Sequence, residues 1–214
     1  RPQPACPVEP TTGMVECRWA SAFTVTPEAT WVTGEYLFKL VRDDGFESYV
    51  PMVVREATPR APMVFQASVN TWQAYNDWGD TSLYVNRTEG PFTGEHAYRV
   101  SFDRPYTGSD CCGTHGAGQL LFWEAYMARW LESRGYDIAY VTNVDVDRSP
   151  DVALGGRMFL SVGHDEYWTT GERDALDRAR DRGLSLGFFG ADTGVYHVRY
   201  APGTAGGDRR APAC

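Results

Sequence analysis

The sequence predicts an α/β fold built on a parallel, doubly wound sheet, with a β-rich N-terminal portion. Three observations carry this prediction. Strand-like and helix-like segments alternate with short links between residues 120 and 189, which is typical of helices covering a parallel sheet. Two of the strand-like segments are continuously apolar, as expected for strands buried on both faces. A hairpin pattern precedes residue 60, so we expect a β-rich segment over 1–60 and an α/β domain over 61–214.

The hairpin is expected after about thirty polar, Pro-containing residues that read as coil. Residues Tyr36–Arg42 and Ser48–Val54 have strand composition, and Asp43–Gly45 between them forms a turn. Pro51 cannot donate a main-chain hydrogen bond, so the second strand is expected at an edge or a bulge.

The α/β portion starts with a short apolar strand, and a long Gly-, Thr- and Pro-rich loop over 86–118 precedes its first helix. The helices are expected to end at Gly135 and Gly183, since glycine favours the C-terminal position. The expected elements are, in order, strand 63–67, helix 120–134, strand 137–141, strand 158–163, helix 169–182 and strand 184–189. No helix or strand is expected after residue 203, so the sheet is expected to be incomplete at its C-terminal end.

Five cysteines indicate an oxidising compartment. Cys6 and Cys17 are close enough in sequence to form a disulfide that staples the loose N-terminal segment. Cys111 and Cys112 are adjacent, so one or both are expected to pair with Cys214 or another chain, and the odd count leaves one thiol over. With no signal peptide at residue 1, this pattern favours a mature secreted or periplasmic protein.

Composition excludes several classes of partner. The net charge of -8 and pI near 5.0 argue against nucleic acid or an anionic membrane surface as the main partner. No apolar run approaches the roughly 18 residues of a membrane-spanning helix, so no membrane span is expected. Aromatic residues make up 14% of the chain, which suits small-molecule pockets as well as a core.

Polar clusters follow several of the expected strands, where parallel sheets bind ligands. His164, Asp165 and Glu166 follow a buried strand directly; the alternative is a helix N-terminus capped by one of the two acids. The stretch 70–79 and Gly190–Thr193 follow two further strands, and their alternatives are a polar turn and a turn into a helix cap. A solvated turn is the favoured interpretation of the acidic residues that follow strand 137–141.

Several stretches together resemble the C-terminal region of the N,N-dimethylformamidase large (beta) subunit, over roughly residues 18–214. The most specific are Asn-Thr-Trp-Gln-Ala-Tyr-Asn at 70–76 and Gly-His-Asp-Glu-Tyr-Trp at 163–168. The resemblance implies a glutamine-amidotransferase-like core and a mononuclear iron held by two tyrosines and one glutamate. Glu166 matches the glutamate and Tyr75 one tyrosine. Tyr36 is the match for the second tyrosine, with Tyr84 and Tyr49 as alternatives.

This resemblance implies an iron-dependent hydrolase of small amide C–N bonds. Two phenolates and a carboxylate are hard donors that favour Fe³⁺, and metal-bound water would be the nucleophile. His164 and Asp165 are expected to orient Glu166, and Asn70 to hydrogen-bond the substrate. We count these three as the catalytic candidates.

Departures from the family pattern keep other functions open. Asp192 and Tyr196 stand where the family has Asn and Trp, and a further acidic catalytic residue of the family falls beyond residue 214. The alternative is a secreted, non-catalytic binding or structural protein, with a second chain or a missing C-terminal portion completing the sheet. A third hypothesis, a carbohydrate-active protein with stacking tryptophans, has no carboxylate pair to support it.

Overall fold

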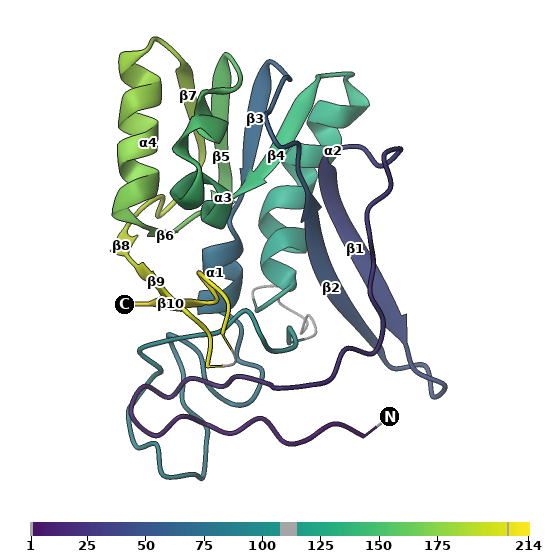
Figure 1. Cartoon of the computed structure of the whole chain (residues 1–214), viewed down its shortest axis with the longest axis vertical. Helices are drawn as coiled ribbons and strands as arrows, with labels where there is room; N and C mark the ends of the chain where they lie inside the picture. The colour runs from purple at the N-terminus through teal and green to yellow at the C-terminus, as the bar shows by residue number, and fades with distance from the viewer. Residues whose placement is uncertain (1, 108–114, 205) are drawn as a thin grey trace.

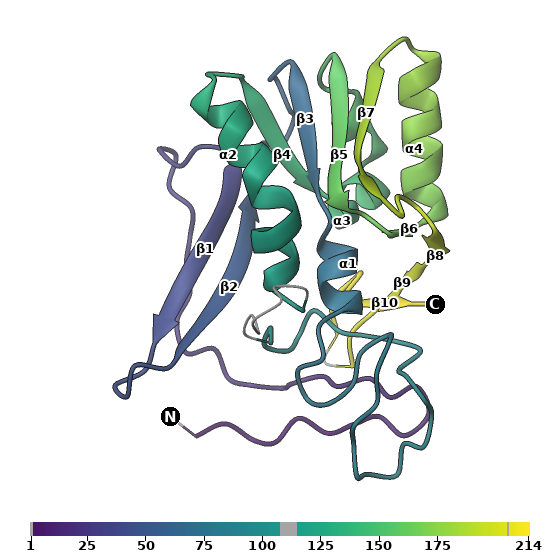
Figure 2. The ribbon, with the colours of Figure 1, turned by 180° about the vertical axis from the view of Figure 1, so that it is seen from behind.

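A four-stranded parallel sheet organises the protein. The computed structural model describes residues 2–107, 115–204 and 206–214. Strand order is β4-β3-β5-β7, as Figures 1 and 2 show from opposite sides. The bounds are β3 Met63–Ala67, β4 Ile138–Thr142, β5 Met158–His164 and β7 Ser185–Ala191. All three neighbouring pairs run parallel, which confirms the α/β class and the parallel sheet.

Helices cover both faces of this sheet. One face packs on α2 (Ala125–Ser133), which follows the short π-helix η1 (Leu120–Glu124); Figure 2 shows α2 in front of the strands. The other face packs on α3 (Asn143–Arg148), the 3-10 helix η2 (Pro150–Leu154) and α4 (Thr170–Asp181). Each face of the sheet has its own hydrophobic core, and alternating residues of β3 pack into the two cores: Val64 on the α4 side and Phe65 on the α2 side.

Local signals in the sequence fix the helix ends. Gly135 and Gly183 have φ of 75° and 86°, the left-handed conformation that glycine adopts without strain, and each follows its helix as expected. The N-terminus of α4 is capped by Thr169 rather than by Asp165 or Glu166. The Thr169 side chain accepts a hydrogen bond from the Glu172 N–H, and the Glu172 carboxylate accepts one from the Thr169 N–H.

The N-terminal hairpin has the expected form. Strands β1 (Gly34–Val41) and β2 (Glu47–Val54) pair antiparallel as a two-stranded sheet, with Leu37 opposite Pro51. Both strands are therefore edges, which agrees with the position of Pro51. Thr33 Oγ1, just before β1, accepts from the Tyr140 N–H of β4 at 2.9 Å and ties the hairpin to the main sheet.

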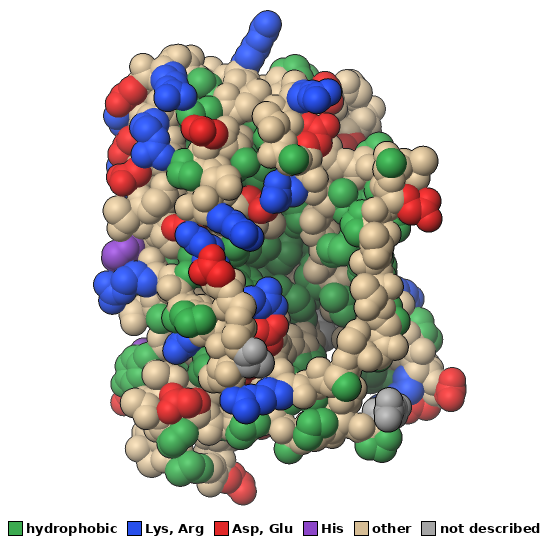
Figure 3. All heavy atoms as spheres, in the orientation of Figure 1, with side chains coloured by type: hydrophobic (Ala, Val, Ile, Leu, Met, Phe, Trp, Pro, Cys, Tyr) green, Lys and Arg blue, Asp and Glu red, His purple; other side chains and the backbone are tan. Residues whose placement is uncertain are grey.

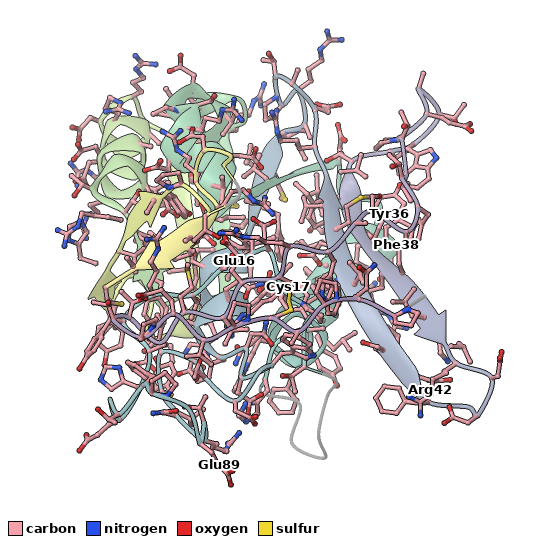
Figure 4. All side chains as sticks on the ribbon, turned by 60° about the horizontal axis from the view of Figure 1, so that its bottom comes forward. Glu16, Cys17, Tyr36, Phe38, Arg42 and Glu89 are labelled. Atoms are coloured by element: carbon pink, nitrogen blue, oxygen red, sulfur yellow. A yellow bond between two sulfur atoms is a disulfide. The ribbon has the colours of Figure 1, made fainter. Side chains whose placement is uncertain are left out.

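A disulfide joins Cys6 and Cys17, as expected; Figure 4 labels Cys17 in the N-terminal segment. Cys214 is free among the described cysteines, and Cys111 and Cys112 lie outside the described residues. The disulfide is compatible with an extracellular or periplasmic protein. In the described part of the chain, no helix has the length and apolar character needed to cross a bilayer.

Three segments differ from the sequence-based expectation. Residues Val69–Ala74 form helix α1, and residues Asn143–Arg148 form α3 instead of a solvated turn. The Thr142 side chain and Asp145 form a capping box at the start of α3. The expectation of no strand after residue 203 is wrong, because β10 (Ala211–Ala213) pairs antiparallel with β9 (Arg199–Ala201). The short strands β6 (Tyr167–Trp168) and β8 (Tyr196–His197) also pair, outside the main sheet.

The surface in Figure 3 carries Lys and Arg side chains interspersed with Asp and Glu, rather than one large patch of a single sign. The same view shows a hollow with hydrophobic side chains between the helices on the left and the hairpin on the right.

Two buried carboxyl groups meet where the hairpin contacts the helical layer. Glu35 of β1 interacts electrostatically with Glu124, which ends η1 and accepts from Trp72 Nε1 at 2.6 Å. Burial raises the pKa of Glu35 from 4.5 to about 7 and raises the pKa of Glu124 well above its ordinary value. At a pH between the ordinary and the raised pKa values, the two carboxyl groups are therefore protonated in the native protein and ionised in the unfolded chain.

We predict that stability falls as pH rises through this window. Between about pH 4.5 and pH 7 the native state binds more protons than the unfolded state, so the free energy of unfolding drops by up to about 3 kcal/mol on the way to pH 8. Glu35→Gln should reduce this dependence in urea unfolding between pH 5 and pH 8, and the raised pKa of Glu124 should leave the rest. The exposed hairpin variant Glu47→Gln is the control and should keep the wild-type slope. An unchanged slope in Glu35→Gln would contradict the prediction.

Candidate functional site

Glu166 lies at the centre of a cluster of polar side chains beyond the carboxyl end of β5. The Tyr84 hydroxyl donates to Glu166 Oε2 at 2.8 Å, and the Tyr75 hydroxyl donates to the same oxygen at 3.1 Å. His164 Nε2 lies 3.2 Å from that oxygen. One carboxylate oxygen therefore gathers two phenols and an imidazole in a mostly buried position.

The backbone around Glu166 is set by a glycine and by α1. Gly163 has φ of 76°, and a Cβ on it would lie 2.7 Å from Trp123 Cβ. Glycine therefore lets the end of β5 pass close to η1 and turn. The Glu166 N–H then donates to Thr71 Oγ1 at 3.0 Å, so α1 holds the peptide that carries the carboxylate.

Both tyrosines come from one loop, which we call the tyrosine loop (residues 75–84). Tyr75 is the first residue after α1, and the Leu83 N–H donates to the Ala74 carbonyl at 3.0 Å. This bond closes the loop, so Tyr84 returns beside Tyr75 with ring centroids 4.3 Å apart. Tyr167 donates a hydrogen bond to the Tyr84 hydroxyl from the other side.

The electrostatics favour one carboxylate and two protonated phenols. Burial is the main cause that raises the pKa of Tyr75 to about 12, and burial also raises the pKa of Tyr84. Burial acts to raise the pKa of Glu166 as well, but hydrogen bonds from His164 and Tyr84 outweigh it and hold that pKa below its ordinary value. Glu166 is therefore ionised at neutral pH and accepts from both phenols.

The donor set suits a hard metal ion. Within the described residues, no group of three or more His, Cys, Asp and Glu side chains converges on one point. The oxygens of Tyr75, Tyr84 and Glu166 do converge, and two phenolates with a carboxylate are the hard donors that ferric iron prefers. Displacing the two phenolic protons would leave three oxygens in place to hold one ion.

Comparison with known families identifies the family of this chain. Residues 1–214 match the family described as N,N-dimethylformamidase beta subunit-like, C-terminal. The chain belongs to the N,N-dimethylformamidase beta subunit-like family. The motifs that carry Tyr75, Tyr84 and Glu166 all lie within the match. Membership relates the chain to a dimethylformamidase-like amidohydrolase. A comparison with curated proteins gave no match.

Tyr75 and Tyr36 are the two tyrosines expected to hold a metal in this dimethylformamidase-like chain. Tyr75 hydrogen-bonds Glu166, whereas Tyr36 does not contact Glu166. Tyr36 lies on β1, labelled in Figure 4, where its hydroxyl donates to the Val32 carbonyl and its ring stacks on Trp31. Tyr49 is on β2, with its hydroxyl 3.5 Å from Glu47. Tyr84, an alternative at the outset, bonds Glu166 beside Tyr75, because the closed loop brings it back to Tyr75.

Asp165 and Asn70 lie beneath the cluster, fully buried, and their partners are protein groups. Asp165 accepts from Gln66 Nε2 at 2.7 Å, Ser161 Oγ at 2.8 Å and Asn143 Nδ2 at 3.0 Å. Asn70 donates to the Tyr167 carbonyl at 2.9 Å and accepts from Tyr200 at 2.7 Å. We therefore interpret both as residues that hold the Glu166 segment, whereas His164 is the expected catalytic residue that contacts Glu166 directly.

Sequence reasoning missed two residues that contact this cluster or the tyrosine loop. Tyr167, which contacts Tyr84, lies inside the Gly-His-Asp-Glu-Tyr-Trp motif. Its position in that motif, next to Glu166, is the sequence feature that could have indicated it. Arg104 contacts the tyrosine loop from within the long loop at 86–118 and belongs to no recognisable motif.

We predict that the Asp165 network sets the stability of the site. Asp165→Ala removes the acceptor of three buried hydrogen bonds, so it should lower the free energy of unfolding by about 3 kcal/mol or more. Ser161→Ala removes one of those donors and should cost only about 1 kcal/mol. Urea unfolding at pH 7 measures both. Equal losses in the two variants would show that Asp165 does not organise the network.

Proposed function

We propose that the chain is a ferric-iron-dependent hydrolase of small amides, with iron held by Tyr75, Tyr84 and Glu166. The observation that supports this most is the convergence of two phenols on Glu166 Oε2, at 2.8 and 3.1 Å. Family membership supports the reaction class, since the family takes its name from an enzyme of amide hydrolysis. A bound ferric ion supplies a Lewis acid that polarises an amide carbonyl and acidifies water.

His164 is the group placed to hold or move a proton beside Glu166. Its Nε2 lies 3.2 Å from Glu166 Oε2 and its Nδ1 lies 3.2 Å from Gln119 Oε1, so both nitrogens have oxygen partners. The ring also contacts Tyr75 and Trp123, with centroids 5.0 and 6.0 Å away. An imidazole fixed in this way is placed to pass a proton to or from a substrate bound beside Glu166.

The surroundings favour a small substrate without charge. Trp123 and Tyr196 are exposed aromatic residues beside the cluster: Trp123 contacts His164, and Tyr196 stacks on Tyr167 with ring centroids 5.2 Å apart. Aromatic walls exclude water and accept alkyl groups, while the polar atoms of the cluster recognise a carbonyl. A simple N-alkyl amide combines these two features.

Family membership and the disulfide support two wider proposals. The family name includes a beta subunit, which supports a second chain as partner. The Cys6–Cys17 disulfide supports a secreted or periplasmic location.

A non-catalytic binding role is the second candidate, and one observation favours it. An apolar groove of about 630 Å³ lies between α2 and the β5–β7 half of the sheet. It is lined by aromatic and aliphatic side chains that include Trp123, Tyr126, Trp130 and Phe189. Apolar surface of this kind marks a place where another surface packs.

Iron binding separates the two candidates. We expect the purified chain to take up one ferric ion per molecule and to show a visible absorption band from tyrosinate-to-iron charge transfer. Tyr75→Phe and Tyr84→Phe should each weaken iron binding and reduce the band, because each removes one of the two phenolates. Binding should weaken at low pH, since the phenolic protons must leave.

Tyr36→Phe is the matched control and should keep both the iron and the band, because Tyr36 lies in the hairpin. A colourless chain without iron after loading, or loss of the band in Tyr36→Phe, would overturn the proposed site. The first of these results would leave the binding role.

A further inference from the structure

Arg104 is a buried cation inside the tyrosine loop. Its residue is 6% exposed, and its guanidinium donates five hydrogen bonds to uncharged oxygens. The acceptors are Asn76 O at 2.6 Å, Thr81 O at 2.8 Å, Trp78 O at 3.0 Å, Gln73 O at 3.2 Å and Gln73 Oε1 at 3.4 Å. Four of the five are main-chain carbonyls of one short stretch of chain.

These carbonyls bracket the two phenols of the candidate site. Those of Gln73 and Asn76 lie on either side of Tyr75, and those of Trp78 and Thr81 lie on the way to Tyr84. The stretch 73–81 therefore wraps around one guanidinium. The group fixes the path of the backbone on both sides of Tyr75 and up to three residues before Tyr84.

A guanidinium suits this task better than any other side chain. It offers five N–H donors in a rigid plane, whereas a lysine ammonium offers three on a flexible stem. Burial lowers the pKa of Arg104 to about 10, so it stays charged at neutral pH. A charge buried among carbonyl dipoles costs free energy whenever one of its bonds is lost, so it resists opening of the loop.

We propose that Arg104 is a positioning residue of the site: by holding the carbonyls of residues 73–81 it sets the separation of the Tyr75 and Tyr84 hydroxyls over Glu166. The inference rests on the proposed function for its iron readout. Arg104 acts through the backbone, since four of its five hydrogen bonds end on main-chain carbonyls of residues 73–81.

Ferric-iron titration of Arg104→Lys tests the consequence for binding. Lysine keeps the charge but cannot hold all four carbonyls, so we expect a folded protein with iron affinity 10- to 100-fold weaker and a shifted charge-transfer band. Arg104→Met removes every bond and should lose more. If it fails to fold, the lysine variant still carries the test.

The control is Arg210→Met. Arg210 bonds Asp103, the neighbour of Arg104, and packs on Phe102, so it probes general damage in the same region. We expect it to keep the wild-type iron affinity. A folded Arg104→Lys with wild-type affinity would overturn the proposal, as would an equal loss in Arg210→Met.

A double-mutant cycle tests the positioning without iron. Tyr84→Phe removes the bond to Glu166 and should lower the thermal midpoint of the wild-type chain by about 2–4 °C. In the Arg104→Lys background that bond is already strained or lost, so the shift should fall to less than half. In the Arg210→Met background it should stay at full size.

Equal shifts in the wild-type and Arg104→Lys chains would show that Arg104 only stabilises the fold, and would overturn the proposal. Failure of the wild-type chain to bind ferric iron would instead overturn the proposed function, and the cycle would still decide the role of Arg104.

Discussion

The shared acceptor Glu166 Oε2 is the constraint on which the rest of the site depends. Two phenols and an imidazole approach one carboxylate oxygen, and the shift of its pKa keeps that oxygen charged. Bringing these groups together costs conformational entropy, because the tyrosine loop is irregular backbone. The protein offsets that cost by closing the loop at Ala74 and Leu83 and by filling it with Arg104. The carboxylate sits at the carboxyl end of a parallel strand, the usual ligand position in such sheets.

Residues that stabilise the fold also orient the side chains of the site. Asp165 ties the turn after β5 to β3, β5 and α3 through Gln66, Ser161 and Asn143, so the orientation of its neighbour Glu166 is set by the sheet itself. The site therefore has a rigid part, which carries Glu166 and His164, and a loop part, which carries both tyrosines. Metal affinity in such an arrangement depends on how well the loop part is held.

Much of this could be predicted from sequence, and the failures have physical reasons. Strands β3, β5 and β7 and helices α2 and α4 followed from apolar runs and glycine stops. Helix α1 was missed because its six residues are buried on every side and show no helical periodicity. Glu166 and Tyr75 sit in specific motifs, but choosing between Tyr36 and Tyr84 needed the loop closure at Ala74 and Leu83. The role of Arg104 could not be predicted from the sequence, because its partners are mostly main-chain carbonyls, which every residue has.

X-ray absorption at the iron edge of the ferric-loaded chain, together with the crystal structure phased at that edge, tests the central claim most directly. We expect a single anomalous peak within about 2 Å of the hydroxyl oxygens of Tyr75 and Tyr84 and of a Glu166 carboxylate oxygen, with an oxygen-only ligand shell from the protein. Iron bound elsewhere, or a shell that lacks either phenolate, would contradict the claim that these three side chains form the metal centre.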